Sequence, residues 1–73
     1  MNCYYIRIES WGTSSPHIID DEAMSLAELG MNYLTPDDFM FLCEAGSMAE
    51  AEEFYWEEAS RAANDAFGER LHP

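Results

Sequence analysis

The sequence contains no lysine, and its three basic residues are all arginines, against 15 acidic residues and a formal net charge of −12 at pH 7. A surface that binds nucleic acid needs cations to replace the counterions of the phosphates. We therefore expect no direct binding to DNA or RNA, and no binding to an anionic membrane surface.

Long apolar runs and paired cysteines are also missing. No stretch approaches the ~20 apolar residues that a membrane-spanning helix requires, and no apolar segment follows a basic start as in a signal peptide. Cys3 and Cys43 have neither the close spacing of a metal site nor the density of a disulfide framework. We therefore expect a cytoplasmic protein whose two reduced thiols serve as small apolar side chains.

Catalytic and metal-binding motifs are absent as well. There is no glycine-rich phosphate loop, and no serine lies in the context of a hydrolase nucleophile. The two histidines are His17 and His72, and His17 precedes the acidic residues 20–22. Acidic residues at a helix start are explained by the helix dipole alone. We expect no enzyme, no cofactor and no metal site; a small metal-binding or enzymatic domain around His17 is the least favoured alternative.

Apolar residues nevertheless make up 48% of the chain and aromatic residues 14%, too many for a disordered acidic segment. We therefore expect residues 1–73 to form a single acidic domain. A chain this short buries a modest fraction of its surface, and its acidic residues repel one another. The domain is expected to be marginally stable at low salt and stabilised by added salt, and a homodimer would add buried surface.

The N-terminal segment is predicted to be a strand. Residues 3–11 (CYYIRIESW) alternate in character and are rich in aromatic and β-branched side chains. Residues 12–16 (GTSSP) have the composition of a turn. Residues 17–19 either form a second strand or lead in extended form to the first helix. We favour the hairpin, because a lone strand has no partner within a monomer.

Two shorter helices are predicted next. The first begins after residues 20–21 and ends at Gly30 or near Tyr33. The second begins with Thr35 as N-cap and Pro36 at the first helical position, and continues through the apolar run FMFLCEA to a glycine. Its uniformly apolar circumference predicts a central place in the core.

The third and longest helix is predicted to begin at the capping box of Ser47 and Glu50 and to run from about 48 to 67 or beyond. Its predicted core face contains Met48, Ala51, Tyr55, Ala59, Ala62, Ala63 and Ala66, flanked by Trp56 and Phe67. Glu57 and Arg61 are expected to pair at i,i+4. The expected fold is therefore α+β, with an N-terminal strand or short hairpin packed against about three helices.

The acidic residues fall into three clusters. The first contains Asp20, Asp21, Glu22 and Glu28, the second Asp37 and Asp38, and the third Glu50, Glu52, Glu53, Glu57 and Glu58. Helix starts and solubility explain the first two clusters. They explain the third less well, because Glu53 and Glu57 repel each other at i,i+4 and no lysine compensates them. We interpret the third cluster as a functional negative surface.

Carboxylates along a helix can stand in for the phosphates of a nucleic acid. Such a surface attracts a basic nucleic-acid-binding groove and steers association. Trp11, Tyr5 and Phe54 are candidate aromatic anchors, and Phe54 lies near the acidic face between two glutamates, where it suits stacking on arginine. Packing against a neighbouring element is the more ordinary interpretation of Phe54.

The short chain, the charge of −12, the absence of lysine, the strand YYIRIESW and the helix segment EAEEFYWEE together resemble phage-encoded inhibitors that mimic DNA, including acidic anti-CRISPR proteins. The resemblance is one of overall character and contains no diagnostic motif. It implies a protein in the host-cell cytoplasm that occludes the DNA-binding groove of a basic partner, such as a CRISPR effector subunit. The predicted partner-binding residues are Glu50, Glu53, Glu57, Glu58, Phe54, Asp20, Asp21, Glu22, Asp37, Asp38 and Trp11.

The alternative hypothesis is a small acidic adaptor or assembly module. It would bind a protein partner through apolar patches around Trp11 and residues 31–34. Its acidity would then serve solubility.

Overall fold

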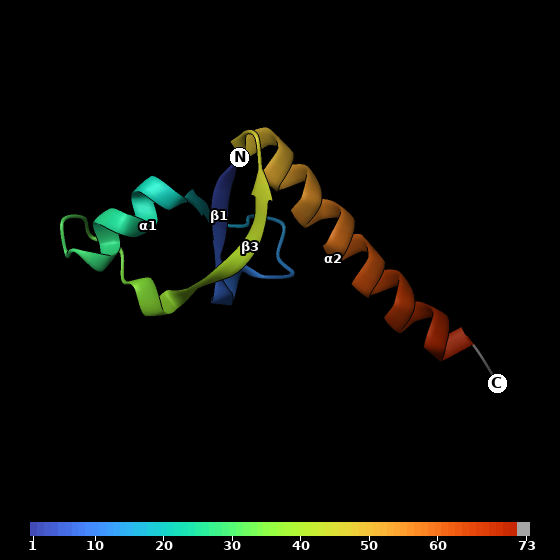
Figure 1. Ribbon diagram of the computed structural model, residues 1–73. Coiled ribbons are helices and arrows are strands. Elements are labelled where there is room, and N and C mark those ends of the chain that lie inside the picture. Colours follow the sequence, from blue (N-terminus) through green and yellow to red (C-terminus); the bar gives the residue numbers. More distant parts are fainter. Residues whose placement is uncertain (72–73) are drawn as a thin grey trace.

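The protein folds into a three-stranded antiparallel sheet with a helix on each face (Figure 1). The computed structural model describes the backbone of residues 1–71 and the side chains of residues 1–63. The central strand β1 (Asn2–Arg7) pairs with β2 (Ile18–Asp20) on one side and with β3 (Phe39–Ala45) on the other. The helices are α1 (Asp21–Glu28) and α2 (Met48–Leu71). The predicted α+β class and the longest C-terminal helix are confirmed, whereas the described chain has two α-helices instead of three.

The predicted hairpin is confirmed, although its first strand is shorter than expected. β2 pairs with β1 in the register Tyr5↔Ile19. The strand ends at Arg7, and residues 8–10 form a 3₁₀ turn, η1 (Ile8–Ser10). The hydroxyl of Ser10 explains the turn, because it donates to the Arg7 carbonyl at 2.8 Å and accepts from the His17 N–H at 3.0 Å.

The boundaries of α1 follow the expected signals. The Asp20 carboxylate accepts a hydrogen bond from the Ala23 N–H at 2.8 Å and so caps the first turn. At the other end Gly30 adopts a φ of 73°, a left-handed conformation that glycine adopts without strain. The helix therefore ends before Gly30 and does not continue to Tyr33.

The predicted second helix is wrong. Its N-terminal signals cap only a 3₁₀ turn, η2 (Pro36–Asp38), and the apolar run after them is the strand β3. The ladder with β1 shifts register between Tyr4 and Tyr5, whose partners are Cys43 and Phe41, so that Leu42 is an extra residue. This bulge buries two neighbouring residues, Leu42 and Cys43, and hides the alternation that would have identified a strand.

Two apolar clusters lie on opposite faces of the sheet. The cluster under α2 contains Tyr4, Ile6, Leu42, Cys43, Ala45, Ala51 and Tyr55. The cluster under α1 contains Ile19, Met24 and Phe39, with Tyr5, Ala23 and Leu34 packed against it. Burial in the first cluster raises the pKa of the Cys43 thiol above its ordinary value. Cys3 lies on the other face, because strand residues alternate and Tyr4 belongs to the α2 cluster.

The start of α2 matches the predicted capping box in its Ser47 half, whereas the Glu50 carboxylate binds the N–H of Gly46 and not that of Ser47. The Glu50 N–H donates to Ser47 Oγ at 3.3 Å, and the Glu50 carboxylate accepts from the Gly46 N–H at 2.8 Å. Ala51 and Tyr55 are completely buried, as expected. Ala62 and Ala63 are exposed, contrary to prediction, because α2 extends beyond the edge of the sheet (Figure 1). The predicted core residues Ala66 and Phe67 lie outside the described side chains.

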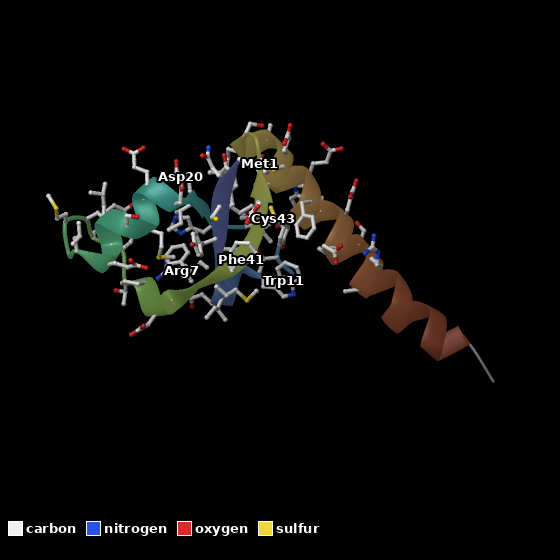
Figure 2. The ribbon with its side chains drawn as sticks, viewed as in Figure 1. Met1, Arg7, Trp11, Asp20, Phe41 and Cys43 are labelled. Atoms are coloured by element: carbon white, nitrogen blue, oxygen red, sulfur yellow. The ribbon has the colours of Figure 1, made fainter. Side chains whose placement is uncertain are left out.

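Tyr55 joins α2 to the loop after η1. Its hydroxyl donates to the Thr13 carbonyl at 2.6 Å, and its ring meets that of Trp11 edge-on at 5.3 Å. Trp11 thus lies between the sheet and α2 (Figure 2). This buried tyrosine fixes a loop that has no other hydrogen bond to α2 among the residues described.

Candidate protein-interaction surface

Three glutamates in the first half of α2 are exposed and unpaired. Glu52, Glu53 and Glu57 have no basic side chain within 4 Å in the part of the chain whose side chains are described. Together with Ala49, Trp56, Ser60 and Arg61, they line a shallow hollow along one side of the helix. We call this surface the α2 acidic face. Its carboxylates can attract a cation without first breaking an internal ion pair.

Trp56 is the aromatic residue of the α2 acidic face. Its side chain is 46% exposed, and its ring meets the buried Tyr55 ring edge-on at 5.0 Å. The sequence interpretation placed Trp56 beside the core and did not include it among the partner-binding residues. Helical spacing could have identified it, because Glu52 and Glu53 precede it by one turn. An exposed indole beside carboxylates can stack on a guanidinium group.

Two glutamates predicted to bind a partner are already engaged within the chain. The Glu50 carboxylate is part of the α2 cap, and Glu58 Oε1 accepts from Arg61 Nη1 at 2.9 Å. The predicted Glu57–Arg61 pair is therefore wrong, and the pair forms at i,i+3 instead. Phe54 is exposed but does not line the hollow. Glu53 and Glu57 are the two predicted partner-binding residues that the hollow brings together.

The acidic residues of α1 do not belong to the α2 acidic face. Asp20 lies beside α1, on the other side of the sheet (Figure 2), where its carboxylate caps that helix. Asp21 and Glu22 are exposed in the first turn of α1. The acidic cluster of α1 is thus a surface separate from the α2 acidic face, whereas η2, which carries Asp37 and Asp38, packs against α1.

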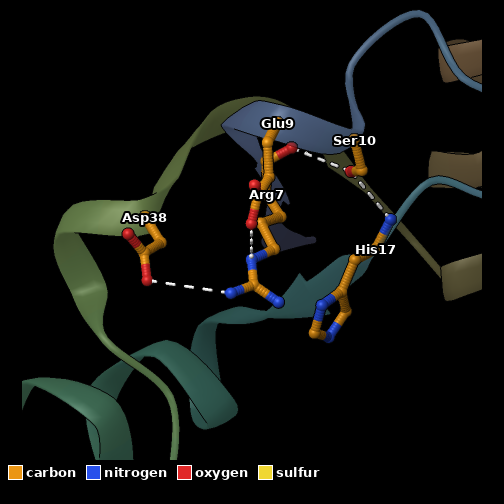
Figure 3. A network of polar contacts seen from close by, with 5 residues as sticks. All are labelled: Arg7, Glu9, Ser10, His17 and Asp38. Carbon is orange, nitrogen blue, oxygen red and sulfur yellow. Dashed lines mark hydrogen bonds and ion pairs between the residues drawn. The ribbon is translucent and has the colours of Figure 1, made fainter.

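The second acidic cluster forms a small network with Arg7 (Figure 3). Arg7 Nε lies 3.1 Å from Glu9 Oε1, without the alignment of a hydrogen bond, and Arg7 Nη2 lies 4.0 Å from Asp38 Oδ2. Asp37 lines a small hollow beside these two acidic residues. Arg7 therefore pairs with this cluster and does not neutralise the glutamates of α2.

His17, the centre of the least favoured alternative, packs against an aromatic ring. Its imidazole meets the Phe39 ring edge-on at 5.3 Å, and the backbone N–H of His17 donates to Ser10 Oγ (Figure 3). Over the described residues, no group of three or more His, Cys, Asp or Glu side chains is arranged to hold a metal ion. No described helix is long and apolar enough to cross a membrane.

The two apolar regions of the adaptor hypothesis lie apart. Trp11 packs on Tyr55 under α2, whereas residues 31–34 follow α1 on the opposite face of the sheet (Figure 1). They do not form one patch.

Comparison with known proteins gave no match to a family model, to a curated sequence or to a solved structure. The fold is therefore defined by its own topology, an antiparallel sheet of order β2-β1-β3 with two helices. A function has to be argued from the chemistry of the surface.

Proposed function

We propose that this chain is a protein-binding inhibitor whose α2 acidic face occupies the basic nucleic-acid-binding groove of another protein. The target class is a nucleic-acid-binding protein such as a DNA-binding subunit of a CRISPR effector, met in the host-cell cytoplasm, so that the chain acts as an anti-CRISPR protein by mimicking DNA. The observation that carries this proposal is the set of unpaired carboxylates, Glu52, Glu53 and Glu57, around an exposed Trp56.

The spacing of these charges supports mimicry of a phosphate backbone. Glu53 and Glu57 are four residues apart, which is roughly 6 Å along the axis of an α-helix. Phosphates of one DNA strand follow one another at about 3.4 Å along its axis. Every second phosphate of one strand is therefore about 7 Å apart along the axis, close to the separation of Glu53 and Glu57, so lysines and arginines arranged for alternate phosphates can also meet these carboxylates.

The energetic disadvantage of the arrangement also supports a role in binding. Like charges at i,i+4 destabilise a helix by a few tenths of a kcal/mol, and a lysine in place of Glu57 would turn this repulsion into an attraction. The chain contains no lysine anywhere. A cationic partner would relieve the repulsion on α2, and the net charge of −12 would speed encounter with it.

DNA displacement tests the proposal. An effector complex is loaded with fluorescently labelled duplex DNA and titrated with the chain at about 150 mM salt, where the Debye length is about 8 Å. We expect the anisotropy of the DNA to fall as it is released. Glu53→Lys should raise the concentration needed for half-displacement about tenfold or more, since it removes an attraction and adds a repulsion.

Glu44→Lys is the matched control for this experiment. Glu44 is exposed on β3, outside the α2 acidic face, and the substitution changes the net charge by the same amount. We expect it to shift half-displacement by no more than about threefold. Equal losses in the two variants would assign the effect to net charge alone, and failure of the unaltered chain to displace DNA from any basic partner would reject the proposal.

A further inference from the structure

The loop that follows α1 carries the most exposed group of large apolar side chains in the described chain outside the N-terminus. Leu29 and Met31 are each 71% exposed and Tyr33 is 91% exposed, within five consecutive residues. Leu26, one turn earlier on α1, is also exposed. We call residues 29–33 the α1 tip. Clustered exposed apolar side chains on a small acidic protein indicate an interaction site.

The backbone of the α1 tip is fixed by hydrogen bonds from its first residues. The Met31 N–H donates to the Leu26 carbonyl at 2.8 Å, and the Gly30 N–H donates to the Ala27 carbonyl at 3.0 Å. These two bonds, with the positive φ of Gly30, form a Schellman motif at the end of α1. The orientation of the tip relative to α1 is therefore set by the helix itself.

The far end of the α1 tip is also anchored. Asn32 Nδ2 donates to the Ala23 carbonyl at 3.0 Å, and Asn32 Oδ1 accepts from the Leu34 N–H at 2.9 Å. Leu34 packs against the buried cluster under α1. Met31 and Tyr33 thus project from a backbone held on both sides, and binding through them loses little backbone conformational entropy.

We propose that the α1 tip is a second docking element, which inserts Leu29, Met31 and Tyr33 into an apolar pocket of a protein partner whose rim carries cations. The inference goes beyond the proposed function, because the tip and the α2 acidic face lie on opposite sides of the sheet (Figure 1). A large aromatic side chain with a polar end is a typical anchor in such a pocket.

Charge decides which occupant fits the α1 tip. Glu28 precedes the tip and η2, which packs against α1, contributes Asp37 and Asp38. Among the described arginines, Arg7 is held by Glu9 and Asp38, and Arg61 lies on α2. The surroundings of the tip are therefore acidic, and they disfavour both an anionic membrane surface and a second copy of the chain, because like charges repel. A protein pocket with a cationic rim is complementary in both polarity and charge.

Chemical-shift mapping with two peptides tests the inference. The probes are an amphipathic helical peptide of leucine and lysine, and a scrambled peptide of identical composition that has no apolar face. We expect the amphipathic peptide to shift the backbone amides of residues 29–34, and the scrambled peptide to shift only the α2 acidic face, around residues 52–60. The double variant Met31→Ser/Tyr33→Ser should weaken the effect at the tip about tenfold.

Met40→Ser is the matched control, because Met40 is 37% exposed on β3 and pairs with Ile6, on the face of the sheet that α2 covers. It should leave the shifts at 29–34 unchanged. If the double variant unfolds, Tyr33→Ser alone removes the most exposed of the side chains.

Equal shifts at the tip with the scrambled peptide, or unchanged affinity in the serine variants, would overturn the inference. So would equal shifts at the tip with phosphatidylcholine vesicles, which would indicate a lipid surface. Shifts on α2 report separately on the proposed function, so the two can fail independently.

Discussion

Tyr55→Ala is expected to remove a large part of the protein's free energy of unfolding. Tyr55 is fully buried between α2 and the sheet, contacts Trp11 edge-on and donates the 2.6 Å hydrogen bond to Thr13. Truncation of a buried aromatic side chain to alanine lowers the free energy of unfolding by about 3–5 kcal/mol. A domain of 73 residues has a total stability of about 4–11 kcal/mol, so a single cavity at this position removes much of it.

Tyr55→Phe distinguishes the contribution of the ring to stability from that of the hydroxyl. It keeps the buried ring and loses the hydrogen bond, which is worth about 1 kcal/mol. The Thr13 carbonyl belongs to an exposed residue and can bind water instead. Urea unfolding followed by far-ultraviolet circular dichroism measures both variants. A loss below about 1 kcal/mol for Tyr55→Ala would show that α2 does not depend on this side chain.

Salt is expected to stabilise the free protein and to weaken its complex. Raising the ionic strength from about 0.01 M to 1 M shortens the Debye length from about 30 Å to 3 Å, which screens the mutual repulsion behind the charge of −12. Each kcal/mol of repulsion removed raises Tm by about 4–8 °C in a domain this small. The same screening removes the attraction between the α2 acidic face and a basic groove, and affinity should fall more than tenfold.

Thermal unfolding over a salt series gives the slope of Tm against salt concentration, and DNA displacement over the same series gives the slope of affinity against salt concentration. Opposite signs are the expected result. A complex that persists unchanged at 1 M salt would favour the adaptor hypothesis, because apolar contacts are little affected by screening. In that case the α1 tip, and not the α2 acidic face, would carry the affinity.

The elements that sequence predicted well are those fixed by local chemistry. The capping box of Ser47 and Glu50 opens α2 at Met48, and Gly30 ends α1, because each signal involves atoms within four residues of one another. The strand β3 was mistaken for a helix because its identity depends on pairing with β1, far away in the sequence. The bulge at Leu42 then removed the alternation that would have corrected the error.

The candidate site was predicted only in part, because it too depends on contacts between residues that local chemistry does not determine. Whether Glu53 and Glu57 are paired depends on where the arginines lie in space. Arg61 pairs with Glu58 and not, as expected, with Glu57. Trp56 was placed beside the core because helical phase cannot tell where the sheet ends beneath α2. Its exposure makes it part of the acidic surface.

The most direct test of the central proposal is whether the chain and DNA exclude each other on one basic partner. An effector subunit is first saturated with labelled DNA at about 150 mM salt, and the chain is then added. The mass of the complex and the anisotropy of the DNA are recorded in parallel. We expect mutual exclusion: the chain binds only as the DNA leaves, and amides of residues 52–60 gain protection from hydrogen exchange in the complex. A ternary complex, in which the chain binds while the DNA stays in its groove, would contradict it.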